Sequence, residues 1–151
     1  MNRPLYYLPN ARTDEQRAKM VRLEESGICM FCPEHLAAEQ EGPIIEEADY
    51  WAVTFNQFPY AGSRLHFLLL PKQHITDVAD LSPEAWMELG WLLRVLRLRF
   101  EFEHYGFFVR NGHPAHTAGT IFHVHAHVVV GDTNDPAHEP IKVKLTGRPA
   151  A

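Results

Sequence analysis

Residues 121–130 read IFHVHAHVVV and place three histidines at alternate positions inside an otherwise apolar run. Such a run predicts a strand, and side chains on a strand alternate between its faces, so His123, His125 and His127 are expected on one face. Successive members of this row lie about 7 Å apart along the backbone. Each buried imidazole needs partners for two ring nitrogens, which makes a purely structural role for all three difficult to satisfy. The row therefore indicates chemistry.

Two kinds of chemistry suit this array of histidines. An H-x-H pair, here His123 and His125, can hold a catalytic metal that keeps one position open for water. Alternatively, one histidine is a nucleophile, which suits phosphoryl groups because neutral imidazole is a good attacking base near pH 7. The loop before the histidines carries Gly112, Gly119 and Thr120, whose backbone amides and hydroxyl can surround an anion. This loop favours the second interpretation.

The rest of the chain predicts a sheet around the histidine strand and one long helix. Residues 66–70, HFLLL, are an apolar run stopped by Pro71, as expected of a central strand buried on both faces. Ser82-Pro83 is a helix start, after which apolar residues recur every three or four positions. The predicted helices are 14–25 and about 83–104, and the other predicted strands are 44–47, 50–55, 107–110 and 122–130. The fold class is α+β with a largely antiparallel sheet.

Composition excludes several classes of partner. A length of 151 residues with 46% hydrophobic content fits a single domain, 1–151. The formal charge of -5 and the scattered Lys and Arg residues offer no basic face, so no polymeric nucleic acid is expected as a partner. No apolar run reaches about 18 residues and the N-terminus has no leader pattern, so we expect no membrane partner and a cytoplasmic location.

The histidine motif extends to a wider resemblance. Residues 123–129, HVHAHVV, match the His-φ-His-φ-His-φ-φ signature, and the chain resembles the histidine triad (HIT) superfamily of nucleotide hydrolases and transferases. Residues 66–74 are similar to the second signature strand of that family, 56–59 to its ribose-contacting segment and 111–120 to its phosphate loop. The resemblance covers about residues 27–131. It implies a five-stranded, mainly antiparallel sheet with helices, commonly paired as a homodimer. The shorter N-terminal helix, 14–25, and a tail at 132–151 lie outside the region of resemblance.

The resemblance also implies an activity at the α-phosphate of an AMP-containing nucleotide. His125 would be the nucleophile that forms a covalent nucleotidyl-histidine intermediate. The implied catalytic residues are His125, His127, Thr120 and Asn111, and the implied substrate-binding residues are Asn56, Gly119, Thr120 and His127. Arg64 and Lys72 are the cations expected near the cleft. A zinc-dependent hydrolase that uses His123 and His125 as metal ligands, and a nucleotide-binding sensor without turnover, are the alternatives.

Two regions differ from shorter members of the superfamily. The chain has extra residues between Pro59 and His66, and one more between Asn111 and His123. These insertions leave the base and the leaving group of the substrate open.

Cys29 and Cys32 form a CxxC pair, which in a reducing compartment indicates metal or redox chemistry rather than a disulfide. The strand and helix pattern of thioredoxin-like redox motifs does not follow it. Some members of the superfamily, with the related galactose-1-phosphate uridylyltransferases, place structural zinc on a CxxC and two histidines, and the resemblance maps these onto Cys29, Cys32, His74 and His123. Four ligands leave no position for water, so we expect one structural zinc ion per chain. The alternative is two free thiols packed near a helix end.

The long helix carries more apolar residues than one stripe of about 100° requires. If Trp86, Leu89, Leu93, Leu96 and Phe100 face the sheet, then Trp91, Leu98 and Val95 point away from it. An exposed apolar patch usually marks a partner surface, which agrees with a two-fold dimer through this helix. The alternative is that the N-terminal helix or the tail covers the patch within one chain.

Overall fold

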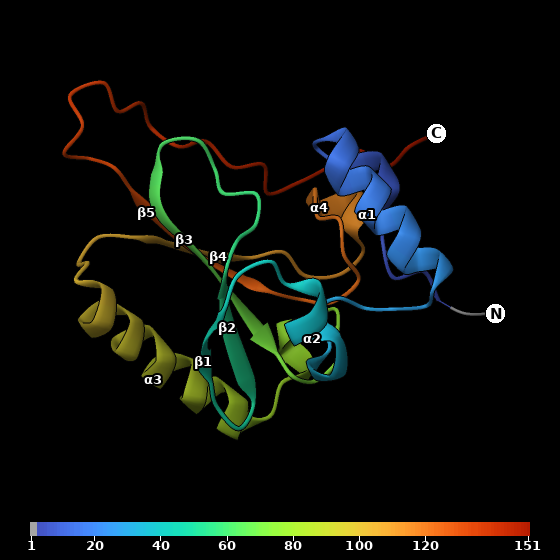
Figure 1. Cartoon of the computed structure of the whole chain (residues 1–151), viewed down its shortest axis with the longest axis horizontal. Helices are drawn as coiled ribbons and strands as arrows, with labels where there is room; N and C mark the ends of the chain where they lie inside the picture. Colours follow the sequence, from blue (N-terminus) through green and yellow to red (C-terminus); the bar gives the residue numbers. More distant parts are fainter. Residues whose placement is uncertain (1–2) are drawn as a thin grey trace.

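The computed structural model describes residues 3–151 and contains a five-stranded antiparallel sheet in the order β1-β2-β3-β5-β4 (Figure 1). The strands are β1 (Ile44–Glu47), β2 (Trp51–Phe55), β3 (Ser63–Pro71), β4 (Gly106–Val109) and β5 (Ala126–Gly131). The helices are α1 (Asp14–Glu25), α2 (Pro33–Glu39), α3 (Pro83–Phe100) and α4 (Pro114–Thr117), with short 3-10 helices η1 (Leu8–Asn10) and η2 (Val78–Asp80). The predicted α+β class is confirmed. Within the described chain, no helix is long and apolar enough to cross a membrane.

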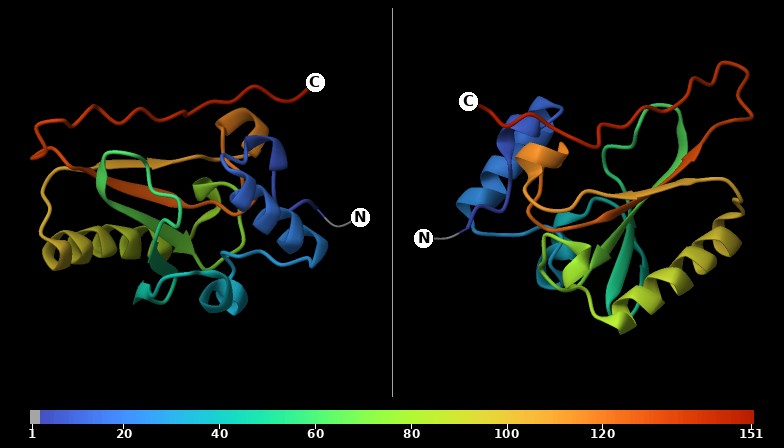
Figure 2. Two further views of the ribbon diagram at one scale, coloured as in Figure 1. Left: turned by 45° about the horizontal axis from the view of Figure 1, so that its top comes forward. Right: turned by 180° about the vertical axis from the view of Figure 1, so that it is seen from behind.

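The central strand β3 is buried on both faces, as its apolar run predicts. Phe67 and Leu69 pack in a core with α3, whereas Leu68 and Leu70 pack in a second core with the N-terminal segment. Figure 2 shows α3 alongside the sheet, and the extended C-terminal segment running from β5 toward α4 and α1. Because Leu68 pairs with His127 on β5, that histidine lies on the face of the N-terminal segment.

The two predicted helices form, with one corrected boundary. At α1, the Thr13 hydroxyl accepts from the amide of Gln16 at 3.0 Å, and the Gln16 side chain accepts from the amide of Arg12 at 2.7 Å. Helix α3 ends at Phe100 rather than near residue 104. Glu101 adopts a left-handed conformation, φ 51°, and its amide bonds to the carbonyl of Arg97, which caps the helix.

The histidine strand begins later than predicted. Strand β5 starts at Ala126, because its neighbours β3 and β4 pair with it no further than that residue. The preceding backbone bonds elsewhere: the amide of Val124 donates to the carbonyl of Ile75 at 2.7 Å, and that of Phe122 to the N-terminal segment at 2.8 Å. The prediction of a regular strand from residue 122 is therefore wrong, and the three histidines do not form one row.

The face of α3 opposite the core carries exposed apolar side chains. Trp91 is 53% exposed and Leu98 is 82% exposed, as expected, and Met87 joins them at 77%. Trp86, expected to face the sheet, is 44% exposed, because the buried stripe of α3 consists of Ala85, Leu89, Leu92 and Leu96 and Trp86 lies beside that stripe. Neither α1 nor the tail covers these side chains, so the alternative of a patch covered within one chain is wrong.

Candidate active site and metal site

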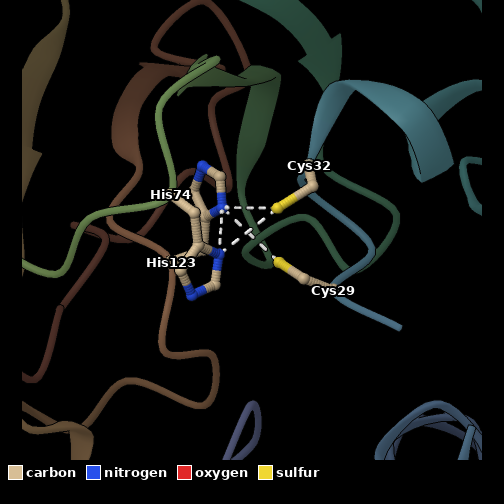
Figure 3. Close-up of side chains that lie close together, drawn as sticks. All are labelled: Cys29, Cys32, His74 and His123. Atoms are coloured by element: carbon tan, nitrogen blue, oxygen red, sulfur yellow. Dashed lines mark hydrogen bonds between the residues drawn. The ribbon is translucent and has the colours of Figure 1, made fainter. Parts of the chain in front are cut away.

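Four side chains expected as metal ligands come together: Cys29, Cys32, His74 and His123 (Figure 3). Their donor atoms all lie within 4.8 Å of one another. The two histidine Nδ1 atoms are 3.2 Å apart, and Cys29 Sγ lies 3.4 Å from Nδ1 of His123. Cys32 Sγ lies 3.3 Å from Nδ1 of His74. Ligands around a tetrahedral zinc are about 3.3–3.8 Å apart, as bond lengths of about 2.0–2.3 Å require. The cluster fits one zinc ion.

The protonation of these groups also suits a metal. His123 Nε2 lies 2.8 Å from the carbonyl of Pro71, which can only accept, so Nε2 carries the proton and the Nδ1 lone pair faces the cluster. Burial raises the pKa of Cys32 to about 12 and raises that of Cys29, and burial lowers the pKa of His123 to about 4. Two buried thiolates would thus need a cation to stabilise them.

The cluster joins distant parts of the chain. Both cysteines are buried in the N-terminal segment, where Cys32 directly precedes α2. His74 follows β3, and His123 precedes β5 and the cavity residue His125. A metal held here would fix the N-terminal segment to the backbone that carries the other histidines.

The second part of the site is a cavity of about 550 Å³. Five of the residues implied by the resemblance line it: Asn56, Gly119, Thr120, His125 and His127. Asn111 does not line it, and its side-chain oxygen accepts instead from the amide of Val78, the first residue of η2, at 2.8 Å. The structure therefore does not bring Asn111 to the other residues.

His125 is poised as a neutral base with a free ring nitrogen. Its Nδ1 lies 2.9 Å from the carbonyl of His123, so Nδ1 carries the proton and Nε2 keeps a lone pair. Burial lowers the pKa of His125 to about 4, which keeps the ring neutral at pH 7. Phe31, which lies between the two cysteines in the sequence, packs edge-to-face with the His125 ring at a centroid distance of 5.1 Å. This arrangement suits nucleophilic attack.

His66, which was not predicted as a site residue, fixes the tautomer of His127. Nε2 of His66 lies 3.2 Å from the Nδ2 donor of Asn56, whereas Nδ1 lies 3.2 Å from the amide of Tyr60. We assign the proton to Nε2, because the fixed backbone amide of Tyr60 can only donate and so requires an acceptor at Nδ1. Nε2 of His66 lies 2.9 Å from Nδ1 of His127 and donates to it, so His127 carries its own proton on Nε2. Burial lowers the pKa of His66 to about 4 and lowers that of His127. Phe108 stacks on the His127 ring at 4.5 Å. The available signal for His66 was the alternation along β3, which places it on the same face as Leu68, the residue that pairs with His127.

The cations at the cavity differ from those expected. Arg12, Arg110 and Lys144 line it, whereas Arg64 and Lys72 do not. Lys72 instead pairs with Glu47 at 3.2 Å. Among the described residues, no Asp or Glu lines the cavity. The alternation on β4 was the available signal for Arg110, because it continues the face of Phe108, and Phe108 pairs with His127 on the neighbouring strand.

Segments outside the predicted core complete the walls. Asn10 donates from Nδ2 to the carbonyl of Gly119 at 2.7 Å, and so ties the N-terminal segment to the loop before the histidines. From the tail, the amide of Gly147 donates to the carbonyl of His116 at 2.8 Å. Val143 and Lys144 of the tail line the cavity.

Comparisons with known proteins agree with this architecture. A family model described as HIT domain matches residues 37–134. A hypothetical histidine triad nucleotide-binding protein from Sulfolobus tokodaii strain7 is 21% identical, covering 80% of each chain, with a TM-score of 0.57. A HIT family hydrolase from Clostridium thermocellum is 19% identical, covering 70% of this chain and 91% of that chain, with a TM-score of 0.53. Diadenosine triphosphate hydrolase from Plasmodium falciparum is 22% identical, covering 64% of this chain and 65% of that chain, with a TM-score of 0.50. No curated protein sequence matches the chain.

Proposed function

Because the chain belongs to the HIT family, we propose that it cleaves nucleotides at the α-phosphate through a covalent nucleotidyl-histidine on His125, as a hydrolase or nucleotidyltransferase. The observation that carries the proposal is that two histidine ring nitrogens with opposite hydrogen-bonding roles, one acceptor and one donor, line the same cavity. His125 offers a lone pair on Nε2, and His127 offers a proton on Nε2. The structural relatives named as a hydrolase, a diadenosine triphosphate hydrolase and a nucleotide-binding protein support the same class of substrate.

The first step is attack by the imidazole. The Nε2 lone pair of His125 forms a bond to the α-phosphorus while the bond from phosphorus to the leaving group breaks, and the leaving group takes that electron pair. The ring then carries positive charge, which strengthens the hydrogen bond from its Nδ1 to the carbonyl of His123. The N–H of His127 donates to negative charge that develops on the departing atom.

The second step regenerates the histidine. Water attacks the same phosphorus, the phosphorus-nitrogen bond breaks, and its electron pair returns to Nε2 of His125. The nucleoside monophosphate leaves with the oxygen of water, and one proton is released. Replacing water by another acceptor in this step would make the protein a transferase.

Other residues bind and orient the nucleotide. Thr120 and Gly119 lie in the loop that precedes the histidines, where a hydroxyl and backbone amides can approach the α-phosphate. Asn56 is held by a bond from the amide of Phe58 to its side-chain oxygen at 2.9 Å and would lie near the ribose. A zinc ion bound by the four-residue cluster would supply a rigid tie to the backbone of His123.

The geometry favours this chemistry over a catalytic metal. His123 and His125 would have to share an ion in the zinc-dependent alternative, yet His123 faces the cysteines and His125 faces the cavity. The sensor alternative keeps the same cavity and differs only in turnover.

The test is a panel of dinucleoside polyphosphates, nucleoside phosphoramidates, adenylylated conjugates and nucleotide sugars, followed by mass spectrometry. Rapid denaturation during turnover should trap a nucleotidyl adduct on the peptide that carries His125. His125→Ala should bind AMP without turnover, while His104→Ala, a change at an exposed histidine, should behave as wild type. Wild-type turnover by His125→Ala would contradict the mechanism. Tight AMP binding without turnover by the wild type would support the sensor.

A further inference from the structure

Arg110 and His127 point two donors at the same part of the cavity. The Arg110 Nη1 atom lies 3.4 Å from Nε2 of His127. Because His66 places the proton of His127 on Nε2, both atoms are donors and do not form a hydrogen bond with each other. Two adjacent donors of this kind can share one acceptor, and a negatively charged oxygen satisfies both.

The rest of the Arg110 guanidinium is fixed by uncharged partners. Its Nε and Nη2 donate to the backbone carbonyl of Lys144 at 3.0 and 2.8 Å, and Nη2 also donates to the hydroxyl of Tyr60 at 3.2 Å. No carboxylate lies within ion-pair distance of Arg110 in residues 3–151. The cation is therefore held in position without a counter-ion among these residues, and its Nη1 lies beside Nε2 of His127 at the wall of the cavity.

The charge of the side chains around the cavity indicates how much negative charge the substrate carries. Arg12, Arg110 and Lys144 line it and no Asp or Glu does, within the part of the chain that the structure describes. This excess of positive charge occurs in a chain whose formal charge is -5. An α-phosphate bound to an amine leaving group offers little negative charge to three cations. A leaving group that is itself a phosphate offers more.

We propose that Arg110 is a catalytic residue that binds, together with His127, a phosphate oxygen on the leaving side of the α-phosphate, and so selects nucleotides with a phosphate as leaving group. The inference rests on the proposed reaction at His125. In that reaction the bond between the α-phosphorus and the bridging oxygen breaks. The oxygen keeps the electron pair and departs on a phosphate, whose charge Arg110 balances without a proton transfer.

The C-terminal tail is the positioning element for Arg110. The carbonyl of Lys144 receives two of its bonds, and three residues later Gly147 fixes the tail against α4. A Cβ atom at position 147 would lie 2.6 Å from the backbone oxygen of Ala115, so a side chain there must displace the tail.

The first experiment compares two substrates with the same nucleoside. Arg110→Met should lower kcat/KM for a dinucleoside triphosphate about 10- to 100-fold, as expected for loss of a charged hydrogen bond. For a nucleoside phosphoramidate, the loss should stay below about threefold. Arg110→Lys should lose nearly as much on the triphosphate, because one ammonium cannot replace a fork held at three donors. Arg64→Met removes an exposed arginine outside the cavity and should change neither value. Equal losses on both substrates, with melting temperatures unchanged, would overturn the assignment to the leaving side.

A binding measurement separates this inference from the proposed chemistry. In the His125→Ala chain, ADP should bind at least about tenfold more tightly than AMP, and adding Arg110→Met should remove that difference. This result would support the role of Arg110 even if wild-type protein turns over neither substrate, an outcome that would instead reject the proposed function. An unchanged ratio of ADP to AMP affinity would overturn the inference. Adding Gly147→Ala to the full-length His125→Ala chain should displace the tail and so reduce the ratio of ADP to AMP affinity. An unchanged ratio in that variant would reject the positioning role of the tail.

Discussion

Substitution of His66 separates its two hydrogen bonds, because Asn and Gln each reproduce one ring nitrogen. Nδ1 of His66 accepts from the amide of Tyr60 at 3.2 Å, and Nε2 donates to Nδ1 of His127 at 2.9 Å. Asn places an oxygen near the position of Nδ1, and Gln places an NH₂ group near that of Nε2. His66→Asn therefore keeps the acceptor and loses the donor, whereas His66→Gln keeps the donor.

The expected magnitudes follow from burial. His127 is only 4% exposed, so its Nδ1 cannot find a water when the donor is removed. An unsatisfied buried acceptor costs about 1–3 kcal/mol, which is about 5- to 150-fold in an equilibrium. The lost hydrogen bond also favoured the tautomer of His127 with its proton on Nε2, so this tautomer becomes less favoured by a similar free energy. We expect kcat of His66→Asn to fall about 10- to 100-fold with a smaller change in KM, and His66→Gln to retain most of its kcat.

The assay is steady-state kinetics on the best substrate of the panel, with a melting curve for each full-length variant. His104→Gln is the matched control, because that histidine is exposed. If His66→Asn is as active as His66→Gln at equal stability, the assignment of the His127 proton is wrong and the mechanism loses its donor at the leaving group.

Three further predictions concern the metal, the assembly and the response to pH. Elemental analysis of protein purified without chelator should find about one zinc per chain, and Cys32→Ser should remove it; protein without zinc would favour free thiols. Light scattering at micromolar concentration should give about twice the chain mass of 17.3 kDa, and Trp91→Glu should return it to the mass of one chain, because Trp91 lies on the exposed apolar face of α3. Burial lowers the pKa values of His66 and His125 to about 4, so the unfolded chain binds more protons below pH 6.5. The free energy of unfolding in urea should therefore fall from about pH 6.5 to about pH 4, less steeply in His66→Gln; a flat profile would contradict the burial of neutral rings.

Local patterns predict the elements whose signals lie within a few residues. The Thr13 cap, the apolar run of β3 and the Ser82 helix start all involve neighbours in sequence, and each of these three features forms as predicted. The start of β5 depends on where β3 and β4 stop pairing, which no local pattern records. The end of α3 depends on a left-handed residue, Glu101, that is not a glycine.

The candidate site shows the same division. The metal cluster and five cavity residues follow from the resemblance, because motif residues stay close to one another in the fold. Asn111 does not line the cavity with these five residues, and its side-chain oxygen accepts from a backbone amide of η2. Arg110 was missed because its orientation depends on the carbonyl of Lys144. Lys144 lies in the C-terminal tail, which has no motif and no regular secondary structure. Alternation places Arg110 on the face of Phe108, but only the pairing of Phe108 with His127 on β5 shows that this face borders the cavity.

His123 joins the two halves of the site and so predicts how metal loss should affect activity. Its ring faces the cysteines, while its carbonyl accepts from Nδ1 of His125. The backbone around it has a second support, because the amide of Val124 bonds to the carbonyl of Ile75. Removing the metal should therefore destabilise the N-terminal segment first and disturb His125 only when the backbone itself moves. Cys32→Ser should lower the melting temperature while kcat near 25 °C changes little, and kcat should then decline at a lower temperature than in the wild type. A large loss of kcat at 25 °C in a fully folded Cys32→Ser chain would show instead that the metal acts directly on the chemistry.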